Sequence, residues 1–597
     1  MFGITLEHFL NNKKLLYQIM KILTIHADFI EFEAKKKAFK GAEEDVEKGK
    51  KERVEECLVV FTAVEKRDEN NVKAIVKKYI SEIKDIAKQV KAENIVLYPY
   101  AHLSSALSNP KTAEEVMKEA EKLLQKDYKV TRAPFGWYKS FNVSCKGHPL
   151  SELSREFSVE GGKAGEEVEE EVDMPNLLKK MSHVQMTAPR GKNDQKSNVE
   201  LGKELDLYFV SEIVGGGLPL FTSKGATIKR EIERFVIDEE IKRGYLHTST
   251  PIMAKSDLYK VSGHWQHYKD DMFSLQVRGE TFALRPMTCP FQFIIYKHKP
   301  RSYKDLPIGY AELAQLFRNE KSGELRGLTR VRQFTLADAH IICQPEKLEE
   351  EFAKVLDLVK FMMEKLGIKD IWYRFSKWDS KDKKGKYIDH PEAWDDSQKS
   401  MRKILNKLKV KFVEVEGEAA FYGPKLDLQY KDIYGKEDTL ITIQIDFALP
   451  ERYDLTYTDK DGKEKRPMVI HRSSSGATER TMAYLLETYQ GKFPAWLSPV
   501  QVKLVTITDD NLPFAKKVMQ QLVDAGIRVE LDDRMESMGK KVRDAQMEKV
   551  NYIVTIGDKE VEKKTLAVRN REGKTKFDVK VDKFVDDLLK EIREKKV

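Results

Sequence analysis

Three short segments of the chain carry arginines in a pattern suited to nucleotide binding. They are Phe-Arg-Asn-Glu at 317–320, Arg-Val-Arg-Gln-Phe at 330–334 and Gly-Ala-Thr-Glu-Arg at 476–480, the last leading into an apolar helical pattern. A guanidinium group keeps its charge and can bind a phosphate through two parallel hydrogen bonds. A single arginine in a charge-rich chain is more often part of an exposed ion pair. The three segments together predict an ATP clamp.

Glycine-rich nucleotide motifs do not account for this clamp. Neither a GxxxxGK[ST] loop nor a GxGxxG turn after a strand occurs in the sequence, which argues against the P-loop and dinucleotide-binding folds. The glycines at 215–217 lead into Leu-Pro-Leu rather than into a helix, so we expect a turn there.

One cysteine and two histidines form a second group with chemical potential. Cys289 follows Arg-Pro-Met-Thr, His340 ends Ala-Asp-Ala-His, and His471 follows Met-Val-Ile. A thiolate with two imidazoles is a good ligand set for Zn²⁺ and leaves coordination positions open. Their wide separation lacks metal-finger spacing, so from spacing alone each is better explained as a buried core residue.

The composition indicates a multidomain, charge-rich chain. At 597 residues it is too long for one hydrophobic core and predicts about three to four domains. Charged residues make up 34%, against roughly 25% in an average protein, and the net charge is +8. Because acidic and basic residues are interspersed, this charge permits RNA as a partner but does not require it.

Cysteine content and hydropathy favour a cytoplasmic protein. The four cysteines, at 57, 145, 289 and 343, form no CxxC pair, so a disulfide framework is not expected. We therefore expect the protein to work in a reducing compartment. No apolar run approaches the roughly 20 residues that span a bilayer, and no membrane partner is expected.

Apolar periodicity divides the chain into zones. Residues 20–156 alternate strand patterns (22–25, 54–61, 94–98) with helical ones (72–90, 112–125), and residues 161–176 have no apolar periodicity and predict a solvated linker. A larger unit follows, with a helix at 226–243, a strand that carries Pro251 and a strand at 440–447. From 502 to 592 the order is β-α-β-α-β-β-α. A buried-strand pattern starts at Met20, so we expect residues 1–19 to precede the first domain.

With these motifs in place, the chain resembles the class II aminoacyl-tRNA synthetases, and among them the archaeal threonyl-tRNA synthetases. Motif 1 corresponds to 226–251, motif 2 to 317–334 and motif 3 to 471–486. The resemblance implies an α/β and α+β multidomain protein with a deacylase-like editing domain, a class II antiparallel-sheet catalytic core and an α/β anticodon-binding domain. The expected boundaries are an extension at 1–19, editing at 20–156, linker at 157–200, catalysis at 201–496 and anticodon binding at 497–597.

The resemblance also assigns roles in the ATP site. It implies that Arg318 binds the α-phosphate, Glu320 the adenine amino group, and Arg480 the γ-phosphate, while Phe334 stacks on the ring and Arg332 also contacts ATP. Attack of a carboxylate on the α-phosphorus builds charge that guanidinium groups and Mg²⁺ can stabilise, so no protein nucleophile is needed.

The same comparison implies an amino-acid pocket with Zn²⁺, one per subunit, held by Cys289, His340 and His471. A metal with open positions can select threonine over the isosteric valine, which lacks the hydroxyl. The implied threonine-binding residues are Asp338, Tyr422, Thr442 and Gln444, with Gln444 also counted as catalytic beside Arg318 and Arg480. The alternative interpretation of Tyr422 is an aromatic residue of the hydrophobic core. Leu336 and Thr439 replace glutamines of bacterial relatives.

Serine differs from threonine by one methyl group, which is worth only about 1–3 kcal/mol of discrimination, so a second, hydrolytic site is expected. Residues 20–156 resemble the archaeal editing module, related to D-aminoacyl-tRNA deacylases. The residues carried over are His102, Tyr138, Lys139 and Glu152. Without the resemblance, Lys139 would be taken for a surface lysine.

The C-terminal region resembles the anticodon-binding domain of the histidyl, glycyl, threonyl and prolyl synthetases. Glu560 and Arg569 match base-reading positions, and Lys549 a further RNA contact. Carboxylates and guanidinium groups can read splayed bases, although alone such charges more often form a solvated surface.

The resemblance therefore implies the activity of a threonine–tRNA ligase, with ATP, L-threonine and tRNA(Thr) as substrates, editing of Ser-tRNA(Thr), and a homodimer formed through motif 1. Two alternatives stay open. A prolyl or seryl synthetase would share the ATP motifs without the substrate-binding metal site, and a non-catalytic RNA-binding paralogue would have lost an ATP arginine.

Overall fold

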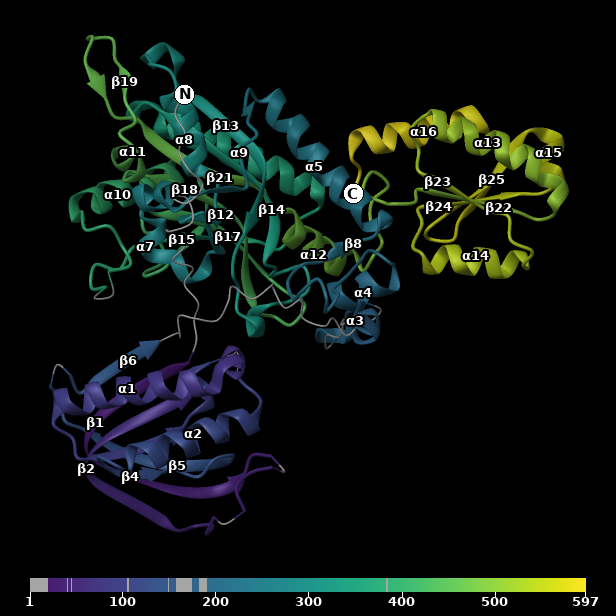
Figure 1. The fold of residues 1–597 in the computed structure, drawn as a ribbon. Coiled ribbons are helices and arrows are strands. Elements are labelled where there is room, and N and C mark those ends of the chain that lie inside the picture. Colours follow the sequence, from purple (N-terminus) through teal and green to yellow (C-terminus); the bar gives the residue numbers. More distant parts are fainter. Residues whose placement is uncertain are drawn as a thin grey trace, which may run out of the picture. The chain divides into compact units, whose positions relative to one another are not determined.

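The chain forms two compact units, residues 1–171 and 172–597 (Figure 1). The computed structural model describes residues 20–39, 41–44, 46–104, 107–148, 150–156, 174–181, 190–382 and 385–597. The predicted extension at 1–19 and most of the predicted solvated linker at 161–176 lie outside the described residues.

The first unit is a six-stranded sheet with two helices on one face (Figure 1). Its strand order is β4-β3-β2-β1-β5, with β6 also paired to β1. The elements are β1 (Lys21–Lys37), β2 (Lys51–Ala63), α1 (Val72–Val90), β3 (Asn94–Pro99), α2 (Pro110–Leu124), β4 (Lys129–Arg132), β5 (Trp137–Cys145) and β6 (Glu152–Glu156). The predicted strand and helix positions in this unit are confirmed.

The two faces of this sheet carry different side chains. Strand residues such as Leu58 and Ile95 pack under α1 and α2, in one core. Their strand neighbours point the other way, and there Phe61 and Tyr98 form an aromatic cluster with Phe141, which is 41% exposed. None of the helices formed by the described residues of this unit covers the aromatic face, and such a face is a place where a ligand can bind.

Part of the expected linker at 157–200 is helical. The structure has α3 (Met174–Met181) and α4 (Asn198–Glu204), the latter capped by Ser197, whose hydroxyl accepts from the Glu200 amide. Asn198 is anchored because its side chain donates to Glu487 Oε1 over 2.7 Å. The ordered second unit therefore begins before residue 201.

The second unit is built around an eight-stranded sheet of order β16-β15-β17-β18-β21-β14-β13-β9. Its strands are β9 (Leu246–His247), β13 (Ile308–Phe317), β14 (Gln333–Cys343), β15 (Trp372–Ser376), β16 (Phe412–Val415), β17 (Lys425–Lys431), β18 (Glu437–Asp446) and β21 (Met468–Ala477). The main helices are α5 (Ser223–Lys242), α8 (Cys289–Lys297), α9 (Leu348–Leu366), α10 (Pro391–Lys407) and α12 (Thr478–Tyr489).

Smaller elements surround this sheet. A three-stranded sheet and two strand pairs comprise β10 (Met253–Lys255), β11 (Ser274–Val277), β12 (Glu280–Leu284), β7 (Tyr208–Phe209), β8 (Leu220–Phe221), β19 (Tyr457–Thr458) and β20 (Glu464–Lys465). Short helices are α6 (Ser256–Ser262), α7 (His264–Tyr268) and α11 (Leu449–Arg452).

The predicted helix at 226–243 and strand at 440–447 are confirmed by α5 and β18, but the predicted strand through Pro251 is wrong. Pro251 lies between β9 and β10, in neither strand. Proline has no N–H to donate to a strand ladder, and here it stands where the chain leaves one sheet for another.

Alternation along the central strands separates core from cavity. Ile341, Ile443 and Ile470 join the hydrophobic core that includes residues of α5, α9 and α12. The residues next to them along the strands, His340, Gln444 and His471, point to the opposite face, because successive side chains alternate across a strand. One face of the sheet is therefore apolar and packs against helices, while the opposite face carries these polar residues beside an apolar cluster that includes Ile342 and Val469.

The C-terminal region is a five-stranded sheet of order β23-β22-β24-β25-β26. It contains β22 (Val502–Thr506), α13 (Leu512–Asp524), β23 (Val529–Asp532), α14 (Met538–Met547), β24 (Tyr552–Ile556), α15 (Asp558–Lys563), β25 (Thr565–Asn570), β26 (Thr575–Lys580) and α16 (Val581–Glu594). Figure 1 shows α13 and α16 on one face and α14 on the other. The predicted elements are confirmed, but the prediction missed α15 and β26.

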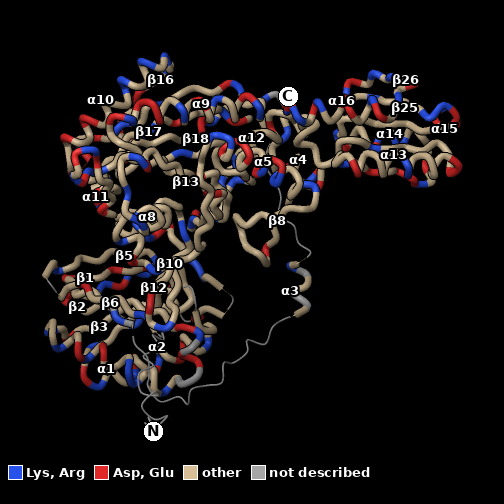
Figure 2. The backbone as a smooth tube through the Cα atoms, turned by 90° about the horizontal axis from the view of Figure 1, so that it is seen from above, with Lys and Arg blue, Asp and Glu red and all other residues tan. Residues whose placement is uncertain are grey.

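Acidic and basic residues are interspersed along each unit, as the sequence pattern indicates (Figure 2). None of the helices formed by the described residues has the length and hydrophobicity that a bilayer-spanning helix needs.

A buried ion pair joins α5 to β21. Arg472 Nη1 donates to Glu240 Oε1 over 2.6 Å, and both side chains are almost fully buried. Burial alone would raise the pKa of Glu240, but the charge of Arg472 and hydrogen bonds from His247 and Ser474 hold it below its usual value. The pair therefore ties the amphipathic helix α5 to the central sheet.

We expect Glu240→Ala to lower the free energy of unfolding by about 3–5 kcal/mol, because it leaves the Arg472 guanidinium buried without its partner. Equilibrium urea denaturation measures this change. Lys242→Ala, which removes the exposed partner of Glu239 on the same helix, should cost less than about 1 kcal/mol. Equal losses for the two variants would contradict the structural role of the buried pair.

Candidate active site

The polar face of the central sheet opens into a cavity of about 290 Å³. Register places Gln444 of β18 beside His471 of β21, and His471 beside His340 of β14, so three neighbouring strands contribute one row of polar side chains. The cavity lining includes the predicted metal and threonine residues, most of the predicted ATP residues, and Arg330, Leu336 and Thr439: Cys289, Arg318, Glu320, Arg330, Phe334, Leu336, Asp338, His340, Tyr422, Thr439, Thr442, Gln444, His471 and Arg480.

Cys289, His340 and His471 come together in the lining of this cavity. Each offers a ligand atom, and these atoms lie within 4.8 Å of one another. All three side chains are buried. Cys289 is the first residue of α8, so the helix brings the thiol to a sheet that already carries the two imidazoles. Residues far apart in the sequence thus form a compact ligand set.

The chemistry of this set fits a divalent metal. His471 Nε2 lies 2.7 Å from Asp446 Oδ2, whose carboxylate also accepts from the amides of Ala448 and Leu449. A histidine that donates one ring N–H to a fixed acceptor presents the other nitrogen to a metal. Burial lowers the pKa of His340 well below its usual value, which favours the neutral ring that a metal requires. The three residues are therefore compatible with a metal site.

Two arginines enter the cavity from different elements. Arg318 follows β13 and lies over the Phe334 ring, 5.1 Å from its centroid. Arg480 lies in the first turn of α12, where its guanidinium donates to the Thr329 and Thr439 carbonyls over 3.0 and 2.6 Å. A Cβ at Gly476 would lie 2.3 Å from Leu440 O, so only glycine lets β21 turn into α12 at this point.

The third predicted ATP arginine is placed differently. Arg332 is outside the cavity lining, and its guanidinium donates to the carbonyls of Glu320 and Gly216. Arg330 lines the cavity instead and pairs with Glu320 Oε2 over 2.8 Å. Arg330 and Arg332 are two residues apart in the segment before β14, outside any named strand, and only the fold decides which of them faces the cavity.

The predicted threonine residues share one end of the cavity. Tyr422 OH donates to Gln444 Oε1 over 2.5 Å and stacks on the His471 ring at 4.9 Å. The Thr442 hydroxyl donates to the buried Asp427 over 3.0 Å. Burial raises the pKa of Asp338, which lies 3.9 Å from His340 Nε2. The core-aromatic alternative for Tyr422 does not account for this polar contact in the cavity.

The two departures from bacterial relatives also lie in this cavity. Leu336 contributes an apolar wall, and Thr439 presents its backbone carbonyl to Arg480 while its hydroxyl accepts from Gln429. A glutamine at either position would present a different set of hydrogen-bonding atoms.

In the first unit, Lys139 of β5 is held at the aromatic face. Its Nζ donates to the carbonyls of Pro134 and Trp137 and lies 5.0 Å from the Tyr98 ring centroid. Burial lowers the pKa of Lys139 to about 8. A partly buried lysine with a lowered pKa differs from the ordinary surface lysine of the alternative interpretation.

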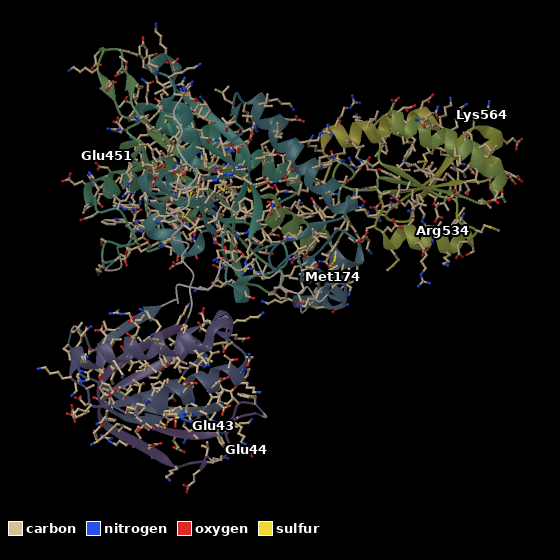
Figure 3. All side chains as sticks on the ribbon, in the orientation of Figure 1. Glu43, Glu44, Met174, Glu451, Arg534 and Lys564 are labelled. Carbon is tan, nitrogen blue, oxygen red and sulfur yellow. The ribbon has the colours of Figure 1, made fainter. Side chains whose placement is uncertain are left out.

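A glutamate that the sequence analysis did not identify organises the loop around Lys139. Glu43, labelled in Figure 3, accepts from the Phe135 amide over 2.8 Å and pairs with Arg132 at 2.8 Å. Its backbone carbonyl accepts from the Trp137 indole. No local motif marks Glu43, because it acts on a segment far along the chain.

The other predicted editing residues are only partly brought together. His102 lies 5.3 Å from Tyr100, an aromatic neighbour of the same cluster, and Tyr138 beside Lys139 is 61% exposed. Glu152 is opposite Ile25 of β1, whereas Lys139 is opposite Ala34. At about 3.3 Å per residue these positions are roughly 30 Å apart. Within one chain, Glu152 is not beside Lys139.

The three predicted RNA contacts lie around β24. Lys549 precedes this strand and lines a cavity of about 130 Å³ with Lys224 and Gly491. Glu560 follows the strand, in the first turn of α15. Arg569 of β25 is opposite Ile553. Lys549 and Glu560 therefore lie at opposite ends of β24, so these predicted contacts do not form one cluster.

Family models match most of the chain. Residues 20–157 match the "Archaea-specific editing domain of threonyl-tRNA synthetase", residues 269–489 the "tRNA synthetase class II core domain (G, H, P, S and T)", and residues 501–591 an "Anticodon binding domain".

Similar proteins carry corresponding names. A threonine–tRNA ligase of Clostridium botulinum (strain Eklund 17B / Type B) is 54% identical over 405 residues, which are 67% of this chain and 63% of that ligase. The chain thus spans less than two thirds of this relative's length. Among solved structures, the RNA-binding domain of threonyl-tRNA synthetase from Cryptosporidium parvum Iowa II is 33% identical with a TM-score of 0.63, covering 66% of this chain and 98% of that domain.

A second solved structure is a putative threonyl-tRNA synthetase, ThrRS-1, from Aeropyrum pernix. It is 28% identical to this chain, with a TM-score of 0.59, and the match covers 67% of this chain and 97% of that one.

Proposed function

We propose, because this chain belongs to the threonyl-tRNA synthetase family of class II aminoacyl-tRNA synthetases, that it is a threonine–tRNA ligase. It would join ATP and L-threonine into threonyl-adenylate, transfer the acyl group to tRNA(Thr), and hydrolyse Ser-tRNA(Thr) in its first unit. The observation that carries this proposal is the row formed by Gln444, His471 and His340, which shares its cavity with Arg318 and Arg480.

The two arginines suit adenylate formation. When the threonine carboxylate attacks the α-phosphorus, negative charge builds on the phosphate oxygens, and a guanidinium such as that of Arg318 can stabilise it. Arg480 is aimed by two backbone carbonyls and would bind the γ-phosphate. Mg²⁺ would accompany ATP. Phe334 offers a ring face beside Arg318 for the adenine.

The opposite end of the cavity would select the amino acid. Zn²⁺ held by Cys289, His340 and His471 would supply the chemistry that separates threonine from valine, an isostere without the hydroxyl. Asp338 lies beside this ligand set and would accept the threonine hydroxyl's hydrogen bond. Tyr422 and Gln444, already bonded to each other, would contact the bound amino acid.

The first unit would remove serine. Lys139 lies at an aromatic face, and a cation there can stabilise the oxyanion of ester hydrolysis. In the C-terminal region, Glu560 and Arg569 would read anticodon bases, and Lys549, near the catalytic region, would contact RNA elsewhere. The enzyme would work in the cytoplasm.

ATP–pyrophosphate exchange tests the ligase proposal. We expect exchange with threonine and a rate with valine lower by on the order of 10⁴-fold, because a site that binds a hydroxyl leaves polar groups unpaired with the analogue. Arg318→Ala should lose about 10²- to 10³-fold. Arg466→Ala, at an ion pair with Asp454 outside the cavity, serves as the control. Exchange that depends on proline or serine rather than threonine would refute the proposal.

Deacylation of Ser-tRNA(Thr) tests the first unit. Lys139→Ala should slow this hydrolysis by about 10²-fold, as expected for loss of one catalytic side chain, while threonine-dependent exchange stays unchanged. Lys146→Ala, at an ion pair with Asp28 on the same sheet, should hydrolyse Ser-tRNA normally. Unchanged serine clearance by the Lys139 variant would exclude the assignment.

A homodimer is supported by an exposed apolar strip at the sheet edge. β9 is the last strand of the eight-stranded sheet, and Ile241, Leu246, Ile252 and Met253 around it are 40–55% exposed. Such a strip beside an open edge strand is suited to pairing with a second copy.

Sedimentation analysis should give twice the chain mass of 69.1 kDa, and Leu246→Asp should shift the protein to monomers because it places a charge in the apolar strip. Val413→Asp on β16, the opposite sheet edge, alters a side chain that is 51% exposed and should leave the dimer intact. Dimers that persist in the Leu246 variant would place the interface elsewhere.

A further inference from the structure

A chain of hydrogen bonds runs from His340 to a buried glutamate. His340 Nδ1 lies 2.5 Å from Gln292 Oε1, and Gln292 Nε2 donates to Thr248 Oγ1 over 2.9 Å. The Thr248 hydroxyl donates onward to Glu312 Oε2 over 3.1 Å or to the Ala311 carbonyl over 3.3 Å. Gln292 is fully buried, and Glu312 nearly so.

The groups at the far end of this series of hydrogen bonds act only as acceptors. Glu312 also accepts from the amide and hydroxyl of Thr250 and from Arg285 Nη1, which lies 2.8 Å from Oε1. With so many donors directed at it, Glu312 acts as an acceptor. The alternative partner of Thr248, a backbone carbonyl, is likewise an acceptor.

This end sets the direction of every other bond. Thr248 has one hydroxyl proton and gives it to an acceptor, so its lone pairs face Gln292 and require the amide's NH₂ there. The amide oxygen of Gln292 must then face His340, whose Nδ1 must carry a proton. If the Gln292 amide were reversed, Thr248 would donate its hydroxyl proton to the amide oxygen. Its lone pairs would then face Glu312 Oε2 and the Ala311 carbonyl, with no proton to form a hydrogen bond.

We propose that Gln292 and Thr248 are positioning residues that fix His340 as the tautomer with a proton on Nδ1, which leaves the Nε2 lone pair for the metal. The inference rests on the proposed function, because it gives these residues a role in the metal site. A polar partner on the far nitrogen orients a ligating ring and tunes its basicity.

Helix α8 carries both a candidate metal ligand and the residue that orients another ligand. Cys289 and Gln292 are three residues apart, so they lie on one face of the helix. One helix thus supplies a metal ligand and the acceptor that orients a second ligand on a strand.

The two histidines use opposite nitrogens. His471 is held at Nε2 by Asp446 and so offers Nδ1, whereas His340 is held at Nδ1 by Gln292 and offers Nε2. The rings meet edge to face, with centroids 4.5 Å apart. Each ring therefore has a separate anchor, a carboxylate for one and an amide for the other.

Zinc affinity tests the inference without relying on activity. In the metal-free full-length chain, competition with a chromophoric chelator should show Zn²⁺ binding about 10- to 100-fold weaker in Thr248→Val than in the wild type. This variant keeps the side-chain shape but removes the acceptor that orients Gln292. Thr248→Ser keeps the hydroxyl and should bind Zn²⁺ like the wild type. Gln292→Leu should weaken binding by a similar factor.

Thermal unfolding of the metal-free variants separates a positioning effect from misfolding. If Gln292→Leu does not fold, Thr248→Val still decides the question. Zn²⁺ binding of wild-type strength in a folded Thr248→Val chain would overturn the inference. A wild-type chain that binds no Zn²⁺ would instead overturn the metal assignment under Proposed function, and the inference with it.

The tautomer itself can be observed by ¹⁵N NMR of histidine-labelled protein. His340, assigned by its loss in His340→Gln, should show a protonated Nδ1 in the metal-free wild type and a mixture of tautomers in Thr248→Val. A wild-type ring protonated on Nε2 would overturn the inference even if the zinc affinities matched expectation.

Discussion

The register of three neighbouring strands, β18, β21 and β14, is the constraint on which the candidate active site depends. It aligns Gln444, His471 and His340 across the sheet while their neighbours Ile443, Ile470 and Ile341 enter the core. A slip of one residue in any of these strands would exchange the two sets. The hydrophobic packing of helices on one face therefore also determines the geometry of the polar face.

Helix ends and strand ends complete what the strands begin. Cys289 enters from the first turn of α8, Arg480 from the first turn of α12, and Arg318 from the end of β13. Buried acceptors then orient the side chains: Asp446 holds His471, and Gln292 holds His340. Positions at element ends allow side chains to converge on one cavity without breaking the sheet.

In the first unit, too, backbone groups orient a functional side chain, that of Lys139, but fewer polar groups take part. A loop tied down by Glu43 presents two carbonyls to Lys139, and an aromatic face limits its solvation, which lowers its pKa to about 8. The distance of Glu152 from Lys139 along β1 shows that matching positions in a family pattern need not be neighbours within one chain.

Local patterns in the sequence determined much of the secondary structure of this protein. Strand alternation and helical periodicity located β1, α1, α5 and β18, because burial of one face leaves a direct record in residue order. The family resemblance singled out Cys289, His340 and His471 as candidate ligands, and their residue types suit a metal such as Zn²⁺. The prediction of a strand through Pro251 was wrong because the point where a chain passes from one sheet to another is not a local property of the sequence. The prediction missed α15 because this short helix has too few turns for a clear periodicity.

Only the tertiary structure decided which side chains meet and which atoms they present. It placed Arg330 rather than Arg332 in the cavity, separated Lys549 from Glu560, and added Asp446, Gln292 and Glu43, which no motif marks. These outcomes depend on strand register and on contacts between distant segments. A hydrogen bond has a direction and a partner, and neither is encoded in the spacing of one residue from the next.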